Sequence, residues 1–224
     1  MKQIYGFGAI QMVPCQNGIV FVSMQDEHDG KATIVYRMFD CENSTVSAVT
    51  RSVFLLNKFG NHFEKFEGNP REFISCKTAI LPNSRILVIG SDKKAVIIGS
   101  NGEEEWTGEM TFKGNSPSSI AAKDNFVWAA YSNPAAIIRY SVGKGLRQEL
   151  RIGSGEDLPS GLESIWPDEN EKLTVCAVGE NKIIKIDPKT YAVSDYHKFS
   201  EPVHDYIKIN SNEIVLTEKG IFRL

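Results

Sequence analysis

The sequence predicts an all-β fold built from one repeated unit. Four prolines recur at steps of 47, 42 and 43 residues, and an apolar segment follows each of them. We call these the phase prolines: Pro70, Pro117, Pro159 and Pro202. Two apolar runs joined by a polar turn then follow, which is typical of antiparallel strand pairs. A period in the forties with several short strands per repeat is typical of a β-propeller. We therefore predict a single β-propeller.

The second strand of each repeat sets the number of blades. Five nearly continuous apolar runs occupy the same phase, and each follows a turn rich in Asn, Asp, Gly or Pro. Strands that are apolar on both faces are buried on both faces, as stacked blades require. The runs begin at Ile19, Ile86, Phe126, Leu173 and Ile214. Five runs predict five blades.

The third strands follow after short loops, and a more polar run suited to an outer edge strand comes next. The third strands begin near Ala32, Ala95, Ala136, Lys182 and Ile221. The last repeat stops at Leu224 without an outer run. We expect the apolar segment at residues 2–7 to supply that strand, so that the ring is closed by the N-terminal strand pairing into the last blade. Closure would remove an open sheet edge.

These assignments divide the single domain into blades. Residues 1–7 complete the last blade, and the blades span residues 8–68, 69–112, 113–156, 157–200 and 201–224. The first blade is too long by a segment at residues 44–68, for which three readings stay open. Residues 53–56 and 62–66 could be the true outer strand pair or an inserted hairpin. The segment could also form an interface through its apolar side chains: Phe54, Leu55, Leu56, Phe59 and Phe63.

Composition excludes several classes of protein. The chain is 42% hydrophobic and 24% charged with a formal net charge of −3, which fits a folded core and lacks the basic excess of a dedicated nucleic-acid binder. There is no apolar leader at the start and no run long enough for a membrane helix. The four cysteines form no C-x-x-C pair, which predicts free thiols and no metal site. We expect a cytoplasmic protein that binds neither nucleic acid nor membrane.

Two short motifs carry a resemblance to known repeats. Residues 186–193, Ile-Asp-Pro-Lys-Thr-Tyr-Ala-Val, resemble the outer hairpin of YVTN-type propellers, and residues 102–106 resemble the Gly-x-x-x-Trp of quinoprotein-like propellers. The chain has no Trp-Asp ending, no Gly-Gly pair of kelch repeats and no Asp-box, so no subfamily and no active site can be carried over. No cofactor is predicted, a quinone included.

The resemblance implies where a ligand would bind. Propellers of this kind bind most ligands at the mouth of the channel, on the face that holds the loops between blades and the loops between second and third strands. We call this the top face. Its loops carry more acid than base, which would attract a cation or a basic partner. The candidate ligand-binding residues are Arg71, Glu72, Asn115, Glu156, Asp157, His204 and Asp205.

Catalysis is the less favoured interpretation of the same face. Glu72 and Asp205 follow phase prolines where inner strands should begin, so they could form the carboxylate pair of a glycoside hydrolase, and Glu163 and Asp157 could join them from a third blade. The equivalent positions in other repeats are Ser119 and Gly161, so the acid set is incomplete. We expect His204 to be a loop residue with local hydrogen bonds and residues 26–29 to be a solvated hairpin tip, too short to wrap a metal ion.

The sequence therefore favours a non-enzymatic binding scaffold that presents its top-face loops to a protein or peptide partner. Two alternatives remain: a carbohydrate-active hydrolase using Glu72 and Asp205, and a propeller that binds a small molecule or sugar without chemistry. The three tryptophans, Trp106, Trp128 and Trp166, occupy different strand positions, which disfavours a lectin with one sugar site per blade.

Overall fold

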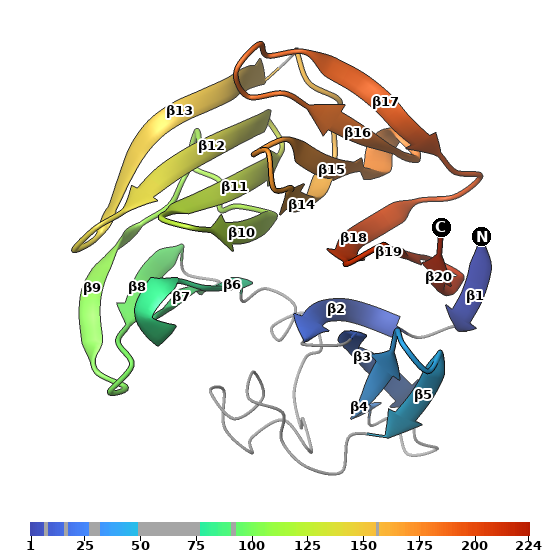
Figure 1. The fold of residues 1–224 in the computed structure, drawn as a ribbon. Coiled ribbons are helices and arrows are strands. Elements are labelled where there is room, and N and C mark those ends of the chain that lie inside the picture. Colours follow the sequence, from blue (N-terminus) through green and yellow to red (C-terminus); the bar gives the residue numbers. More distant parts are fainter. Residues whose placement is uncertain (7–8, 16–17, 27–31, 49–76, 91–92, 156) are drawn as a thin grey trace. The chain divides into compact units, whose positions relative to one another are not determined.

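The structure is a computed structural model that describes residues 1–224 apart from residues 7–8, 16–17, 27–31, 49–76, 91–92 and 156. The described residues form five four-stranded antiparallel sheets, which are the blades of a five-bladed β-propeller (Figure 1). This confirms the predicted fold class. The chain divides into two compact units, one of Met1–Ile74 with Ile207–Leu224 and one of Ser75–Tyr206.

The first unit contains the first blade and most of the last. The first blade has the strand order β2-β3-β4-β5. Its strands are β2 (Ala9–Cys15), β3 (Gly18–Asp26), β4 (Ala32–Asp40) and β5 (Thr45–Ala48). The last blade has the order β1-β20-β19-β18. Its strands are β1 (Lys2–Tyr5), β18 (Val203–Ile209), β19 (Asn212–Thr217) and β20 (Gly220–Arg223).

Strand β1 completes the last blade, as the sequence predicted. It runs antiparallel to β20, with Lys2 opposite Arg223 and Gln3 opposite Phe222, and a bulge follows before Tyr5. The approach is so close that a Cβ on Gly220, whose φ is +129°, would lie 2.1 Å from the Tyr5 carbonyl oxygen. Glycine at this turn therefore permits the pairing.

The second unit contains the three middle blades, whose strands follow chain order from inner to outer. The second blade has β6 (Lys77–Ile80), β7 (Ile86–Ile89), β8 (Lys94–Ile98) and β9 (Glu104–Glu109). The third has β10 (Ser119–Lys123), β11 (Phe126–Ser132), β12 (Ala135–Val142) and β13 (Leu146–Gly155). The fourth has β14 (Leu162–Pro167), β15 (Leu173–Ala177), β16 (Lys182–Ile186) and β17 (Val193–Lys198). Two short 3₁₀ turns, η2 (Pro82–Ser84) and η3 (Val178–Glu180), lie between strands.

The core of this unit lies between neighbouring blades. Side chains alternate along a strand, so β11 sends Val127 and Tyr131 toward the second blade and Trp128 toward the fourth. Trp128 is 1% exposed, and it packs with Val175 and Ile184 of the fourth blade. The apolar second strands are therefore buried on both faces, as their composition predicted.

The long first blade is described only in part. Its fourth strand is β5, directly after a turn in which Asp40 accepts hydrogen bonds from the backbone of Glu42 and Asn43. Residues 49–68 of the segment with three readings, and residues 27–29 of the hairpin tip at residues 26–29, lie outside the described residues. Within the described part of the chain, no helix is long and apolar enough to cross a membrane.

Candidate functional site

A pair of ionisable side chains joins the inner strands of the fourth and last blades. Glu163 and His204 are the second residues of β14 and β18, and each follows a phase proline by a few residues. Nδ1 of His204 lies 2.8 Å from Oε2 of Glu163. Their side chains remain 36% and 41% exposed, His204 first, so the pair is fixed and still open to solvent.

The next residue of each strand forms a second link beneath this pair. The Ser164 hydroxyl donates to Oδ1 of Asp205 at 2.6 Å. The Tyr206 backbone N–H also approaches Oδ1 of Asp205, at 2.8 Å, and the hydroxyl oxygen of Ser164, at 3.3 Å. Ser164 is 4% exposed. The Asp205 carboxylate is therefore held by donors from two strands.

A buried thiol lies behind the Ser164–Asp205 link. Cys176 on β15 stands opposite Ser164 in the strand register, and none of its surface is exposed. Burial raises the pKa of the Cys176 thiol, and the charges of Asp205 and Glu163 raise it further, while a hydrogen bond with Ser164 acts in the opposite direction. A thiol in this environment stays protonated and is a poor nucleophile.

The other predicted site residues have separate surroundings. Asn115 donates from Nδ2 to the Asn133 carbonyl oxygen at 2.9 Å, between two loops of the top face. Asp157 accepts hydrogen bonds at Oδ1 from the backbone N–H of Ser154 at 2.6 Å and from its hydroxyl at 3.1 Å. Three further candidates lie outside the described residues: Arg71, Glu72 and Glu156. The structure thus brings His204 and Asp205 together with Glu163, while Asn115 and Asp157 bind neighbouring loop atoms.

Lysines that the sequence did not single out connect loops of the top face. Lys93 donates from Nζ to the Gly114 carbonyl oxygen at 2.7 Å. Lys113 donates to the Ser154 carbonyl oxygen at 3.0 Å. Both positions precede or follow turn glycines, but nothing in the sequence pattern indicates which carbonyl a lysine would meet. Ser164 was also missed, because it follows Pro159 by five residues whereas Asp205 follows Pro202 by three, so the proline phase did not indicate it.

The chemistry of the site is that of a fixed carboxylate beside an imidazole. Within the described residues, Oε1 of Glu163 makes no hydrogen bond, so this oxygen can accept one from a ligand. The same part of the chain holds no group of three or more His, Cys, Asp or Glu side chains arranged to hold a metal ion. The arrangement is suited to binding a hydrogen-bond donor, and most strongly a cationic one.

No family model matches the chain, and no curated protein matches it. Solved structures do resemble it. A streptogramin B lyase structure has a TM-score of 0.55 and 12% identity, covering 97% of this chain and 83% of that one. The selenomethionine form of virginiamycin B lyase from Staphylococcus aureus has a TM-score of 0.52 and 14% identity, covering 100% and 86%. The computationally designed Ika4 protein has a TM-score of 0.52 and 13% identity, covering 71% and 94%.

These likenesses concern the fold. At 12–14% identity, no functional residue of these proteins can be assigned to a position in this chain. The similar structures include two lyase structures and a designed protein, so the shared fold does not indicate one function. The chain is a five-bladed β-propeller, and the features that bear on its function are those of its own top face.

Proposed function

We propose that the protein is a non-enzymatic binding scaffold that holds a protein or peptide partner at its top face, with Glu163 contacting a basic group of that partner. One observation carries the proposal: the Glu163–His204 pair at the starts of β14 and β18. Its carboxylate is fixed by an imidazole, half-exposed, and has one oxygen available. A preorganised group of this kind loses little conformational entropy when a partner binds.

The charges around the pair support a basic ligand. Glu163 and Asp205 contribute two carboxylates to the same small region, since both act on the Cys176 thiol beneath them. Two lysines of the described top-face loops, Lys93 and Lys113, are engaged by backbone carbonyl oxygens. A cationic side chain approaching Glu163 would be attracted by this field.

The hydrogen bonds of the remaining polar groups favour binding over catalysis. Asp205 accepts a hydrogen bond from the Ser164 hydroxyl, and Asp157 accepts one from the Ser154 backbone N–H. Both carboxylates therefore hold neighbouring segments in place. Cys176 is buried as a neutral thiol. The groups that remain accessible at this place recognise charge, and rigid blades with exposed loops are a common support for such recognition.

A peptide selection tests the proposal. The purified protein would be used to select from a displayed library of random peptides, and the affinity of each selected peptide would then be measured by fluorescence anisotropy. We expect selected peptides to contain Lys or Arg, and Glu163→Gln to weaken their binding about tenfold, a loss of about 1.4 kcal/mol.

The matched control is Glu169→Gln, which removes an exposed carboxylate from the turn between β14 and β15. This variant should bind like the original protein. Selected peptides without basic residues, or equal binding by Glu163→Gln, would contradict the proposal.

A hydrolase remains the second candidate because Asp205 lies beside Glu163, so the structure gathers two carboxylates at the starts of inner strands. The predicted partner carboxylate, Glu72, lies outside the described residues. Release of reducing sugar from a panel of oligosaccharides, lost in Asp205→Asn, would support this candidate. A sugar or small molecule that raises the melting temperature without being cleaved would instead support the ligand-binding alternative.

A further inference from the structure

Exposed hydrophobic side chains gather at the outer edge of the fourth blade. The described residues include six large hydrophobic side chains that are exposed, and three of them lie within six consecutive positions: Tyr191 at 54%, Val193 at 42% and Tyr196 at 38%. We call these three, together with Lys185 and Lys198, the β17 surface. Clustered exposed hydrophobic groups mark interaction sites more often than isolated ones do.

The strand that carries this surface is an edge strand. β17 is last in the order β14-β15-β16-β17, and all six of its residues are exposed. It pairs with β16, and the register shifts at Tyr196, between the positions opposite Ile183 and Ile184. The other side of β17 pairs with no strand among the described residues. An edge strand of this kind presents backbone N–H and C=O groups to a further strand.

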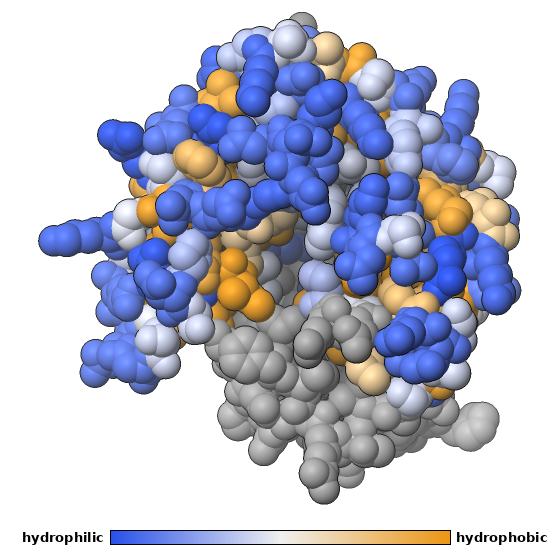
Figure 2. All heavy atoms as spheres, viewed as in Figure 1, coloured by the Kyte–Doolittle hydropathy of each residue, from blue (hydrophilic) through white to orange (hydrophobic). Residues whose placement is uncertain are grey.

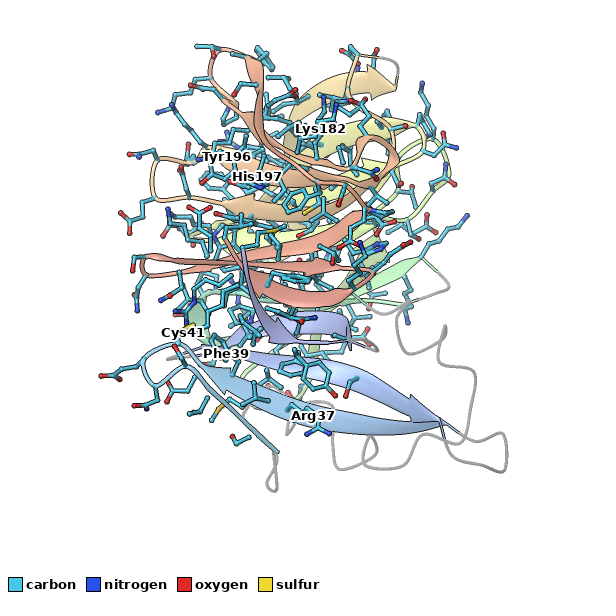
Figure 3. All side chains as sticks on the ribbon, turned by 90° about the vertical axis from the view of Figure 1, so that its right-hand side faces the viewer. Arg37, Phe39, Cys41, Lys182, Tyr196 and His197 are labelled. Atoms are coloured by element: carbon cyan, nitrogen blue, oxygen red, sulfur yellow. The ribbon has the colours of Figure 1, made fainter. Side chains whose placement is uncertain are left out.

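One aromatic ring of the surface is already oriented. Nζ of Lys185, on the neighbouring strand β16, lies 3.7 Å from the centroid of the Tyr196 ring. Figure 3 shows Tyr196 and His197, consecutive residues of β17, close together. Next along the chain, the His197 ring packs against Phe199 at 4.6 Å between centroids. Tyrosines held in this way are frequent binding anchors, since little side-chain entropy is lost on contact.

The charge around the surface is positive. The acidic side chains nearby have cationic partners: Lys182 lies 2.7 Å from Glu180 and 2.9 Å from Asp195, and Lys172 lies 4.0 Å from Asp187. Lys189 and Lys198 are exposed, and within the described residues neither forms an ion pair. In a chain whose net charge is −3, this edge therefore presents unpaired cations beside exposed tyrosines.

We propose that the β17 surface is a docking site for an acidic peptide segment that binds in extended form as a fifth strand of the fourth blade. The backbone of the segment would pair with β17, as in strand addition at other sheet edges. Its side chains would alternate between the two faces of the sheet: those on one face would lie beside Tyr196 and Lys185, and those on the other beside Val193 and Lys198. A second copy of this chain is a poorer occupant, because it would bring two cationic edges together.

This inference goes beyond the proposed function, because it concerns another strand and the opposite ligand charge. The probe is a fluorescent peptide of about eight residues in which Glu and Val alternate, with an alternating Lys-Val peptide of equal length for comparison. We expect anisotropy titrations of the whole protein to give an affinity for the Glu-Val peptide about tenfold higher than for the Lys-Val peptide, and to show weakening with added salt.

Two variants locate the binding. Val193→Ser combined with Tyr196→Ser should lower the affinity for the Glu-Val peptide about tenfold. Ile80→Ser is the matched control, because Ile80 is 46% exposed on the inner strand β6 of another blade. Circular dichroism of each variant would verify folding.

Several results would overturn the inference. Equal affinity for the two peptides would show that the ligand is not selected for its acidic charge. Unchanged affinity of the double variant for the Glu-Val peptide would show that the peptide does not bind at the β17 surface. Failure of the Glu-Val peptide to bind at millimolar concentration would also contradict the proposal. Sedimentation that shows a dimer lost in the double variant would identify a second copy as the occupant instead.

Discussion

At the scale of single residues, Cys176 shows how the fold decides what a side chain can do. The thiol lies in a strand whose five residues are all buried, directly beneath the Ser164–Asp205 link. Burial and two neighbouring carboxylates raise the pKa of Cys176 well above its ordinary value of 9.0. Because only the thiolate reacts, a raised pKa and a lack of access act in the same direction.

We therefore expect Cys176 to resist thiol reagents in the native protein. At pH 8, the number of thiols that react with Ellman's reagent should be the same for the original chain and for Cys176→Ala, whereas in denaturant the variant should react with one thiol fewer. A difference of one thiol under native conditions would show that Cys176 is accessible.

The same pKa shift sets a dependence of stability on pH. Above its ordinary pKa of 9.0, the unfolded chain loses the Cys176 proton while the folded protein keeps it, so this group lowers the free energy of unfolding as pH rises. Below that pH both states hold the proton and the effect is absent. Urea titrations at pH 8 and pH 10 should therefore show a larger fall for the original chain than for Cys176→Ala.

At the scale of elements, the entry to β14 depends on a tight approach between two loops. Gly161 immediately precedes β14 and has φ +72°, and a Cβ built on it would lie 2.9 Å from the backbone nitrogen of Gly179. Its N–H donates to the Ser132 carbonyl oxygen of the third blade at 3.3 Å, and its carbonyl oxygen accepts from Val178 at 2.9 Å. This turn determines where Glu163 begins its strand.

Gly161→Ala should therefore destabilise the protein by more than about 1 kcal/mol, since a left-handed backbone and a close neighbour both oppose the added methyl group. Gly143→Ala is the matched control, because a Cβ at Gly143 would meet no atom within 4 Å. Equal urea midpoints for the two variants would show that the turn tolerates a side chain.

The strands themselves were largely predictable from sequence, and the side-chain pairings were not. Apolar runs at a constant phase indicated the second strands, because a strand that is buried on both faces is apolar at nearly every position and is therefore easy to recognise. The phase prolines indicated that Asp205 lies near the start of an inner strand, whereas His204 was expected in a loop and instead lies in β18, where it meets Glu163 of β14. Their contact at 2.8 Å depends on how the two neighbouring blades are placed along each other. The spacing of the repeats in the sequence gives no information on that placement.

The extra length of the first blade shows the same limit. Its outer strand is β5 at Thr45–Ala48, a short run of modest hydrophobicity beside the more apolar residues 53–56. Hydrophobicity alone favoured the later segment as one candidate for the outer strand. In the described residues, β5 pairs with β4 straight after the turn at Asp40, with Asp40 opposite Thr45, while residues 53–56 lie outside the described residues.

At the scale of the whole molecule, the contact between the last and first blades determines how the two ends of the described chain are held. Within the first unit, Tyr5 of β1 packs on Phe21 of β3, with ring centroids 4.8 Å apart, and the Arg37 guanidinium of β4 lies 5.4 Å from the Tyr5 ring. From β20, Arg223 donates to the Cys41 carbonyl oxygen at 3.3 Å and lies over Phe39 at 5.3 Å. Figure 3 shows Arg37, Phe39 and Cys41 along one blade. Both chain ends therefore contact the first blade through an arginine and an aromatic ring.

Tyr5→Ala should lower the free energy of unfolding by about 2 kcal/mol, because it removes an aromatic contact and a cation–π contact together. Lys2→Ala, an exposed change on the same strand, should have little effect. A double-mutant cycle with Arg37→Ala separates the cation–π contact with Arg37 from the aromatic contact with Phe21. We expect a coupling free energy of about 0.5–1 kcal/mol between Tyr5 and Arg37. Figure 2 shows that much of the visible described surface is hydrophilic. A Tyr5→Ala variant as stable as Lys2→Ala would show that β1 is held by its backbone pairing with β20 alone.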